Sequence, residues 1–249
     1  MSEDTNIGGA QDRFPLTRAS LLVAVRSPQV EERSRALEAL ISAYWKPVYK
    51  YIRIHWNKSN EDAKDVTQEF FTRLLQKDFL DKYDPGRARL RTFLRVCVDG
   101  LVQNEHKAAH RLKRGGDAQF HSLDFESAEG ELQQLEIPDP ESVEDFFNRE
   151  WARSVFELSL ARLRSECDAR GKMVHFRLLE LYDVEDAGKD LTYEEVACQF
   201  GLKASDVTNY LSYARREFRK IVLEHLRETT ATEDEFRREA RALLGVDAK

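Results

Sequence analysis

The chain has 249 residues, of which 41% are hydrophobic, and its formal net charge is −6 at pH 7. This hydrophobic content suffices for packed cores, which excludes a disordered protein. No apolar run approaches the roughly 20 residues that span a bilayer, and no signal-peptide pattern is present. Only 11 Gly and 6 Pro occur, which predicts helix nearly throughout. We therefore expect an all-α, soluble, cytoplasmic protein.

The charges are unevenly distributed along the chain. Residues 87–114 hold eight Lys or Arg against two acidic residues, whereas residues 122–145 hold nine Asp or Glu and no Lys or Arg. A chain divided in this way has a basic surface and an acidic strap rather than a uniform acidic coat. Because the strap opposes phosphate attraction, we expect the free chain to bind DNA weakly.

The first half of the chain reads as one helical domain. Residues 1–13 are predicted to be a disordered tail. Residues 14–114 contain three apolar patterns with helical spacing, at about Val30 to Trp56, Glu61 to Lys77 and Leu90 to Lys113. We therefore assign residues 14–114 to a first domain.

The second half reads as a linker followed by another helical domain. Residues 115–145 are acidic, contain two prolines and lack sustained periodicity, which predicts a linker that is unstructured on its own. Residues 146–228 return to helical spacing and are assigned to a second domain. Residues 229–249 form an extension with a short amphipathic helix, Thr232 to Leu244.

Residues 191–220 predict a helix-turn-helix. Thr192 and Glu195 have the spacing of a capping box, and Gly201 stands where the chain must turn sharply. A second helix follows. Its outward positions carry donors and acceptors that can read base edges, and these are Ser205, Asp206, Thr208, Asn209, Ser212 and Arg215. An ordinary helical hairpin is the alternative that this segment alone leaves open.

The sequence contains no pattern typical of an enzyme or a metal site. We found no paired carboxylates, no nucleophile with a base, no Gly-rich phosphate loop and no H-E-x-x-H. The three cysteines, Cys97, Cys167 and Cys198, are odd in number and widely spaced, and we expect them to be buried small hydrophobes. We therefore predict a protein that is not an enzyme and has no metal or cofactor.

Four motifs in order resemble extracytoplasmic-function (ECF) sigma factors, the initiation subunits of bacterial RNA polymerase. Two of them, Glu61-Asp-Ala-Lys-Asp-Val-Thr-Gln-Glu-Phe-Phe71 and Leu90-Arg-Thr-Phe-Leu94, are similar to that family's polymerase-binding helix and promoter-melting segment. The other two, Phe14-Pro-Leu-Thr-Arg-Ala-Ser-Leu and the run from Val207 to Arg219, resemble a subgroup whose genes often lie near serine/threonine kinases. The resemblance covers about residues 14–228 and implies a region 2-like domain, a linker and a region 4-like domain.

The resemblance implies three sets of contact residues. On the helix from Glu61, the residues expected to bind core polymerase are Asp62, Asp65, Gln68, Glu69, Thr72 and Arg73. In the basic helix, those expected at the promoter-melting element are Arg91, Arg95, Asn104, His106, Lys107 and Arg111. In the helix-turn-helix, those expected at the upstream element are Ser205, Asp206, Thr208, Asn209, Tyr210, Ser212, Tyr213, Arg215, Arg216 and Arg219.

The sequence departs from the family pattern at two places. Many relatives carry an Asn near the site of Gly100 and a denser arginine run after it. Tyr210 and Tyr213 stand where many relatives have Arg, so we expect fewer phosphate anchors and a smaller dependence of DNA binding on salt.

The resemblance implies the partners as well. These are bacterial core RNA polymerase and promoter DNA, with a serine/threonine kinase or an inhibitory protein as candidate regulators and with no membrane. Thr67 and Thr72 are the candidate sites for a kinase. The predicted function is that of an alternative sigma factor in transcription initiation. The alternative is a two-domain helix-turn-helix regulator that no longer binds core polymerase.

Overall fold

The computed structural model describes residues 21–76, 79–108, 123–133, 143–185 and 191–245. Within these ranges it has ten α-helices, one short 3₁₀ segment, one π segment and no strand, which confirms the all-α prediction. None of the described helices is both long and apolar enough to cross a membrane. The α-helices are α1 (Leu21–Val25), α2 (Val30–His55), α3 (Asn60–Leu74), α4 (Leu90–Ala108), α5 (Phe125–Gln133), α6 (Val143–Ala169), α7 (Met173–Leu179), α8 (Tyr193–Phe200), α9 (Ala204–Thr229) and α10 (Glu233–Leu244), with the 3₁₀ segment at Leu80–Lys82 and the π segment at Glu180–Val184.

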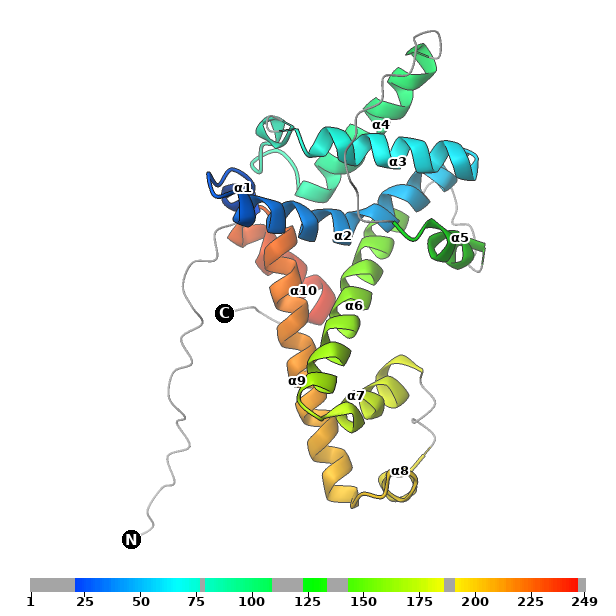
Figure 1. Cartoon of the computed structure of the whole chain (residues 1–249), viewed down its shortest axis with the longest axis vertical. Helices are drawn as coiled ribbons and strands as arrows, with labels where there is room; N and C mark the ends of the chain where they lie inside the picture. The colour runs from blue at the N-terminus through cyan, green and yellow to red at the C-terminus, as the bar shows by residue number, and fades with distance from the viewer. Residues whose placement is uncertain (1–20, 77–78, 109–122, 134–142, 186–190, 246–249) are drawn as a thin grey trace.

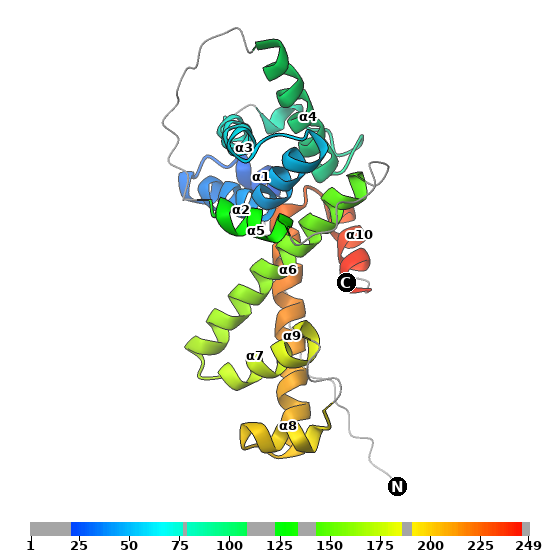
Figure 2. The same cartoon turned by 90° about the vertical axis from the view of Figure 1, so that its right-hand side faces the viewer.

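The helices are arranged at two ends of an elongated molecule (Figure 1). Helices α1 to α4 lie at one end, and α7 and α8 lie at the other. Helices α6 and α9 pack on each other and connect the two ends, as the view turned by 90° also shows (Figure 2). Helix α10 follows α9 and folds back beside it near the first end (Figure 1).

One hydrophobic core joins the two predicted helical domains. It contains buried residues of α2, α3 and α4 together with residues of α5, α6, α9 and α10. At its centre the ring of Tyr44 from α2 stacks on Trp151 from α6, with ring centroids 6.2 Å apart. Both side chains are 1% exposed. The opposite end has two smaller clusters, one between α6, α7 and α9 and one under α8.

Helix α5 lies within the segment that the sequence predicts to be an unstructured linker. Phe125 and Ala128 are buried, and the Phe125 ring contacts the edges of Trp45 and Tyr49 of α2 at centroid distances of 5.6 and 5.1 Å. These residues give the acidic segment a small apolar face, which is too short to show as periodicity but is sufficient to dock on α2. The tail at residues 1–13 and the remainder of the linker up to residue 142 lie outside the described residues.

The helix ends follow the local sequence signals. Ser59 caps α3, where its hydroxyl accepts a hydrogen bond from the Asp62 backbone N–H at 3.1 Å. Thr192 and Glu195 form the predicted capping box of α8. Gly201 ends α8 with φ of 64°, a left-handed conformation that glycine adopts without a steric penalty.

The cysteines differ in part from the prediction. Cys167 is buried and Cys97 is partly buried, but Cys198 is exposed on α8. The prediction for Cys198 is wrong because α8 packs on its neighbours through Val196 and Ala197, and this leaves the position after them facing solvent. Burial raises the pKa of the Cys97 thiol to about 11, so this group stays protonated at neutral pH.

Candidate protein and nucleic-acid interfaces

Helix α3 presents the first predicted set of contact residues on one face. Asp62, Asp65, Gln68 and Arg73 are exposed, and Glu69 and Thr72 are partly exposed. Among the described residues, the contacts of this face stay within α3 and its cap. Arg73 pairs with Glu69, the Thr72 hydroxyl donates to the Gln68 carbonyl at 2.8 Å, and the Asp62 carboxylate accepts from Ser59. The face is therefore available to a partner.

The opposite face of α3 is buried and includes one of the two candidate kinase sites. Thr67 is 0% exposed, and its hydroxyl donates to the Ala63 carbonyl at 2.7 Å. A kinase cannot reach this hydroxyl unless α3 leaves the core. Thr72 is partly exposed, so it is the more accessible of the two.

Helix α9 presents most of the second set to solvent. Seven of the ten predicted residues are exposed, and Asp206, Tyr210 and Tyr213 are partly buried. Asp206 accepts a hydrogen bond from the Lys203 backbone N–H at 3.3 Å and so helps to cap α9. Its role is therefore at least partly structural. The exposed residues are Ser205, Thr208, Asn209, Ser212, Arg215, Arg216 and Arg219.

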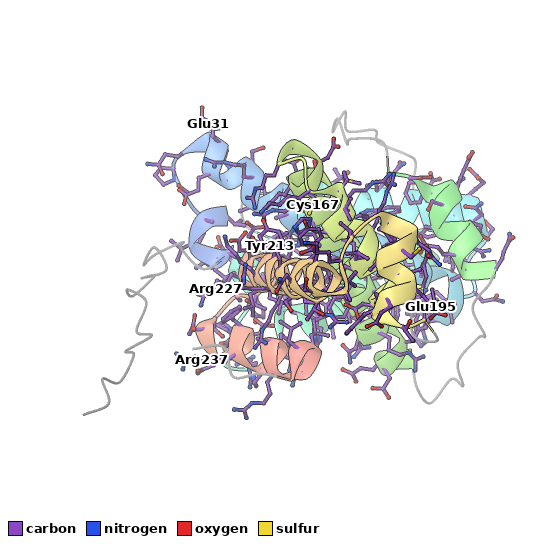
Figure 3. All side chains as sticks on the ribbon, turned by 90° about the horizontal axis from the view of Figure 1, so that it is seen from below. Glu31, Cys167, Glu195, Tyr213, Arg227 and Arg237 are labelled. Carbon is purple, nitrogen blue, oxygen red and sulfur yellow. The ribbon has the colours of Figure 1, made fainter. Side chains whose placement is uncertain are left out.

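Tyr210 and Tyr213 belong to an aromatic and cationic cluster between α7 and α9. The ring of His175 stacks on Tyr210 with centroids 3.9 Å apart, and it meets the edge of Tyr213 at 5.2 Å. The Lys172 ammonium lies 3.9 Å from the centre of the Tyr213 ring, and an Arg170 guanidinium nitrogen is 3.2 Å from the Tyr213 hydroxyl. Figure 3 looks onto this end of the molecule and labels Tyr213 on α9.

This cluster places positive charge beside the tyrosines. The pKa of His175 is lowered by burial and by the charge of Lys172, so this ring stays neutral at physiological pH. The cations beside the Tyr213 ring are Arg170, Lys172 and Arg216, and the first two precede α7 and were not predicted from the sequence. These cations provide positive charge at a place where Tyr210 and Tyr213 themselves carry none.

The arginines of α9 differ in their availability. Arg215 makes a two-point contact with Asp183, with nitrogen-to-oxygen distances of 2.7 and 2.8 Å, and this hydrogen bonding raises the pKa of Arg215. Arg216 is 69% exposed at its side chain, where it makes a long contact, at 3.7 Å, to Glu217 and lies 5.4 Å from the centre of the Tyr213 ring. A DNA phosphate would therefore meet Arg216 and Arg219 directly, whereas it would have to compete with Asp183 for Arg215.

Helix α4 carries the third set, and only part of it faces solvent. Asn104 is exposed, and Arg95 is partly buried within 3.5 Å of Asp99 and 3.8 Å of Glu144. The side chains of His106 and Lys107 and the whole of Arg111 lie outside the described residues. Arg91 is 8% exposed, so it has almost no surface to offer to DNA in this arrangement.

The neighbours of Arg91 come from two other helices. Its guanidinium lies 2.7 Å from a carboxylate oxygen of Glu239 in α10 and 4.7 Å from the ring centre of Trp151 in α6. Sequence reasoning missed this site. A signal was present, because Glu235 and Glu239 share the helical face of Phe236 and Ala240, and acidic residues on an apolar face require buried partners.

A second ionic cluster joins α5 to α2 and α6. Glu129 accepts hydrogen bonds from Arg53 at 2.6 and 3.0 Å, and Glu131 accepts from Lys46 and Lys50, each at 2.7 Å. Hydrogen bonding from Arg53 lowers the pKa of Glu129. Burial acts to raise the pKa of Glu131, but the two lysines outweigh it and the pKa is lowered. Helix α5, a part of the acidic strap, is thus bound to cations of its own chain.

No metal site is apparent among the described residues, since none of their His, Cys, Asp and Glu side chains gather in groups of three or more that could hold a metal ion. What these surfaces can provide is charge, hydrogen bonding and stacking. Such groups can bind protein and nucleic-acid surfaces.

Comparison with known proteins identifies the first of these regions. Residues 40–112 match the family model described as Sigma-70 region 2, and the match includes α3 and α4. No curated protein and no solved structure matches the chain. Sigma factors are not enzymes, in agreement with the prediction that this chain is not one. Residues 40–112 therefore form a Sigma-70 region 2 domain.

Proposed function

We propose that the chain is an alternative sigma factor of the extracytoplasmic-function type. The observation that carries this proposal is the Sigma-70 region 2 match, because it includes a helix, α3, whose polar face is exposed and bound to no other element among the described residues. In this proposal the exposed face of α3 binds core RNA polymerase. Its charged side chains set the register and the rate of association more than the affinity.

The promoter contacts in this proposal come from α9 and α4. The exposed polar face at the start of α9 reads base edges of an upstream element, and Arg216 and Arg219 hold phosphates. The cluster of Arg170, Lys172 and Tyr213 adds positive charge on the same side of α9. Helix α4 provides contacts to the promoter-melting element, beginning with Asn104, which is already exposed.

The other candidate function is a two-domain regulator that binds DNA but not core polymerase. The same molecule would keep α8 and α9 and would have lost the polymerase contact. The Sigma-70 region 2 match favours the sigma factor, because it includes α3, whose residues Asp65, Gln68 and Glu69 contact no other element among the described residues. Association with core polymerase separates the two functions.

The test is a pull-down of core RNA polymerase with the wild-type chain and with Asp65→Arg combined with Glu69→Arg. We expect the double variant to lose association while its thermal stability changes little, since surface substitutions usually stay within about 0.5 kcal/mol. Glu31→Arg with Glu38→Arg on α2 is the matched control, because it makes the same charge reversal at exposed positions outside α3. Wild-type protein that does not retain polymerase would favour the regulator instead.

A further inference from the structure

Helix α10 is docked on the first turn of α4 by carboxylates that water barely reaches. Glu235 is 4% exposed and Glu239 is 2% exposed. Glu235 accepts a hydrogen bond from the Leu90 backbone N–H at 2.8 Å, and Glu239 lies 2.7 Å from Arg91 and 3.3 Å from Arg89. Helix α10 thus contacts three successive groups at the beginning of α4, namely the Arg89 guanidinium, the Leu90 backbone N–H and the Arg91 guanidinium.

These contacts occupy the groups that would meet a nucleic acid at this place. A free backbone N–H at a helix start and two arginines can all bind phosphate oxygens. Here Glu235 accepts the hydrogen bond of the Leu90 N–H, and Glu239 pairs with both arginines. The Trp151 ring packs against the Arg91 guanidinium. DNA can engage the first turn of α4 only after Glu239 has released Arg91.

The contact is of a kind that a competing polyanion can replace. The desolvation of two buried charges offsets much of their electrostatic attraction, so such an ion pair adds little net stability. One oxygen of Glu239 accepts no hydrogen bond from any residue that the structure describes, although Arg89 lies 3.3 Å away. A phosphate with two oxygens directed at Arg91 could replace the hydrogen bond that Arg91 loses when Glu239 is released.

The N-terminal capping contacts of helix α10 come from its own turn and from α9, not from α4. Thr232 caps it by accepting from the Glu235 backbone N–H at 3.1 Å, and Glu235 itself accepts from the Ala231 backbone N–H at 2.9 Å. The turn before it is held to the end of α9 by Thr230, whose hydroxyl donates to the Leu226 carbonyl at 2.7 Å. Release from α4 therefore does not require α10 to unwind.

We propose that α10 is an autoinhibitory helix, which keeps Arg91 from nucleic acid in the free chain through Glu239 and gives way when DNA binds. The proposal rests on the function proposed above only in taking DNA as the ligand of α4. It predicts that weakening the contact between α10 and α4 increases DNA affinity without any change at α9.

The experiment compares Glu239→Gln with Glu233→Gln in the full chain. Both variants remove one negative charge from α10, but Glu233 is half exposed and pairs only with surface arginines, Arg227 and Arg237. Binding of a forked DNA duplex of arbitrary sequence is measured by fluorescence anisotropy at low salt. We expect Glu239→Gln to bind about fivefold or more tightly than Glu233→Gln, the lower end of typical allosteric couplings.

Three results decide the proposal. The gain should disappear when Arg91→Gln is added to both variants, because the group that Glu239 withholds is then missing. Equal DNA affinity of the two single variants, or a gain that persists without Arg91, would overturn the proposal. Core polymerase is absent from these measurements, so a failed pull-down would remove the sigma-factor function and leave this outcome unaffected.

A measurement on the wild-type chain covers the case in which Glu239→Gln does not fold. Amide hydrogen exchange of α10 is compared in the free chain and with saturating forked duplex. Faster exchange of α10 with DNA is expected if the helix is displaced. Unchanged or slower exchange would contradict the release of α10.

Discussion

Helices α5 and α10 are two short acidic helices that dock in the same way and differ in their access to water. Each inserts one phenylalanine into the shared core, Phe125 or Phe236, and each places carboxylates on cations of other helices. The carboxylates of α5 remain partly exposed, with side-chain values of 15% for Glu129 and 26% for Glu131. Those of α10 are almost fully buried.

The difference shows what burial does to an ionic contact. Glu129 keeps some of its water and gains a cation, so its pKa falls. Glu235 loses its water, and burial raises its pKa despite the backbone hydrogen bonds that it accepts. The contacts that hold α5 therefore stabilise the ionised form of Glu129. The packing that holds α10 instead disfavours the ionised form of Glu235. The two helices should respond differently to mutation and to pH.

The largest effect should come from Lys50, the buried lysine of α2 that α5 contacts through Glu131. Lys50 is 0% exposed and pairs with Glu131 and with Glu150 of α6, which is 4% exposed. Lys50→Met should lower the free energy of unfolding by about 3–5 kcal/mol, because it leaves the buried carboxylate of Glu150 without its nearest cation and with Arg153 at 3.6 Å. Urea denaturation measures this loss.

Lys46→Met is the matched control for Lys50→Met. The Lys46 side chain is 19% exposed and pairs with Glu131 and Glu157. Its replacement should cost about 1 kcal/mol or less, as for pairs that water reaches. Equal losses for the two lysines would show that burial does not separate these contacts.

The phenylalanines should show which helix is held more firmly by packing. Phe236 is 3% exposed, and its ring lies 4.1 Å from the Arg227 guanidinium. Phe236→Ala should cost about 3–5 kcal/mol, as is usual for a core phenylalanine. Phe125→Ala should cost less, because Phe125 and Ala128 are the only buried residues of α5, whereas α10 buries four. A larger loss for Phe125→Ala in urea denaturation would reverse this order.

A smaller and local effect should follow from removing one α5 carboxylate. Glu129→Gln weakens the hydrogen bonds from Arg53 and Tyr49, and charged hydrogen bonds contribute about 1.5–3 kcal/mol. Amide exchange within α5 should accelerate by about tenfold or more while α10 stays unchanged. Glu126→Gln, at an exposed position of the same helix, is the control and should leave exchange unchanged. Coupled changes in α5 and α10 would show that the two helices open together.

The smallest effect should be a response of α10, but not of α5, to mild acid. The pKa of Glu235 is raised, so the docked state binds a proton more readily than the undocked state. Docking of α10 should thus strengthen as pH falls from neutrality towards the ordinary glutamate value of about 4.3. The charged or titratable groups that face Glu235 are Arg91, Glu239, Tyr44 and Tyr83.

Helix α5 should not respond in this window. The pKa values of Glu129 and Glu131 are lowered, so their contribution is complete above the ordinary value and is lost only as pH falls through the lowered values. Amide exchange at pH 7 and pH 5, corrected for intrinsic rates, measures both helices. Slower opening of α10 at pH 5 with α5 unchanged is expected, and weaker docking of α10 would contradict the sign.

Prediction from sequence succeeded where a few neighbouring residues determine the outcome. The capping box of Thr192 and Glu195 and the left-handed Gly201 each depend on residues within four positions of one another. The exposed polar face of α3 followed from helical spacing in the same way. These features need no information about the remainder of the chain, because the forces that form them act within one helical turn.

Tertiary structure alone decided which charges remain free. Arg91 and Asn104 lie on the same basic helix and were predicted to act together, yet Arg91 is buried under α10 and Asn104 is exposed. The partner of Arg91, Glu239, is 148 positions away in the chain. Local patterns give the charge of a side chain, but its burial depends on which distant helix covers it, and burial decides whether that charge is available to a partner.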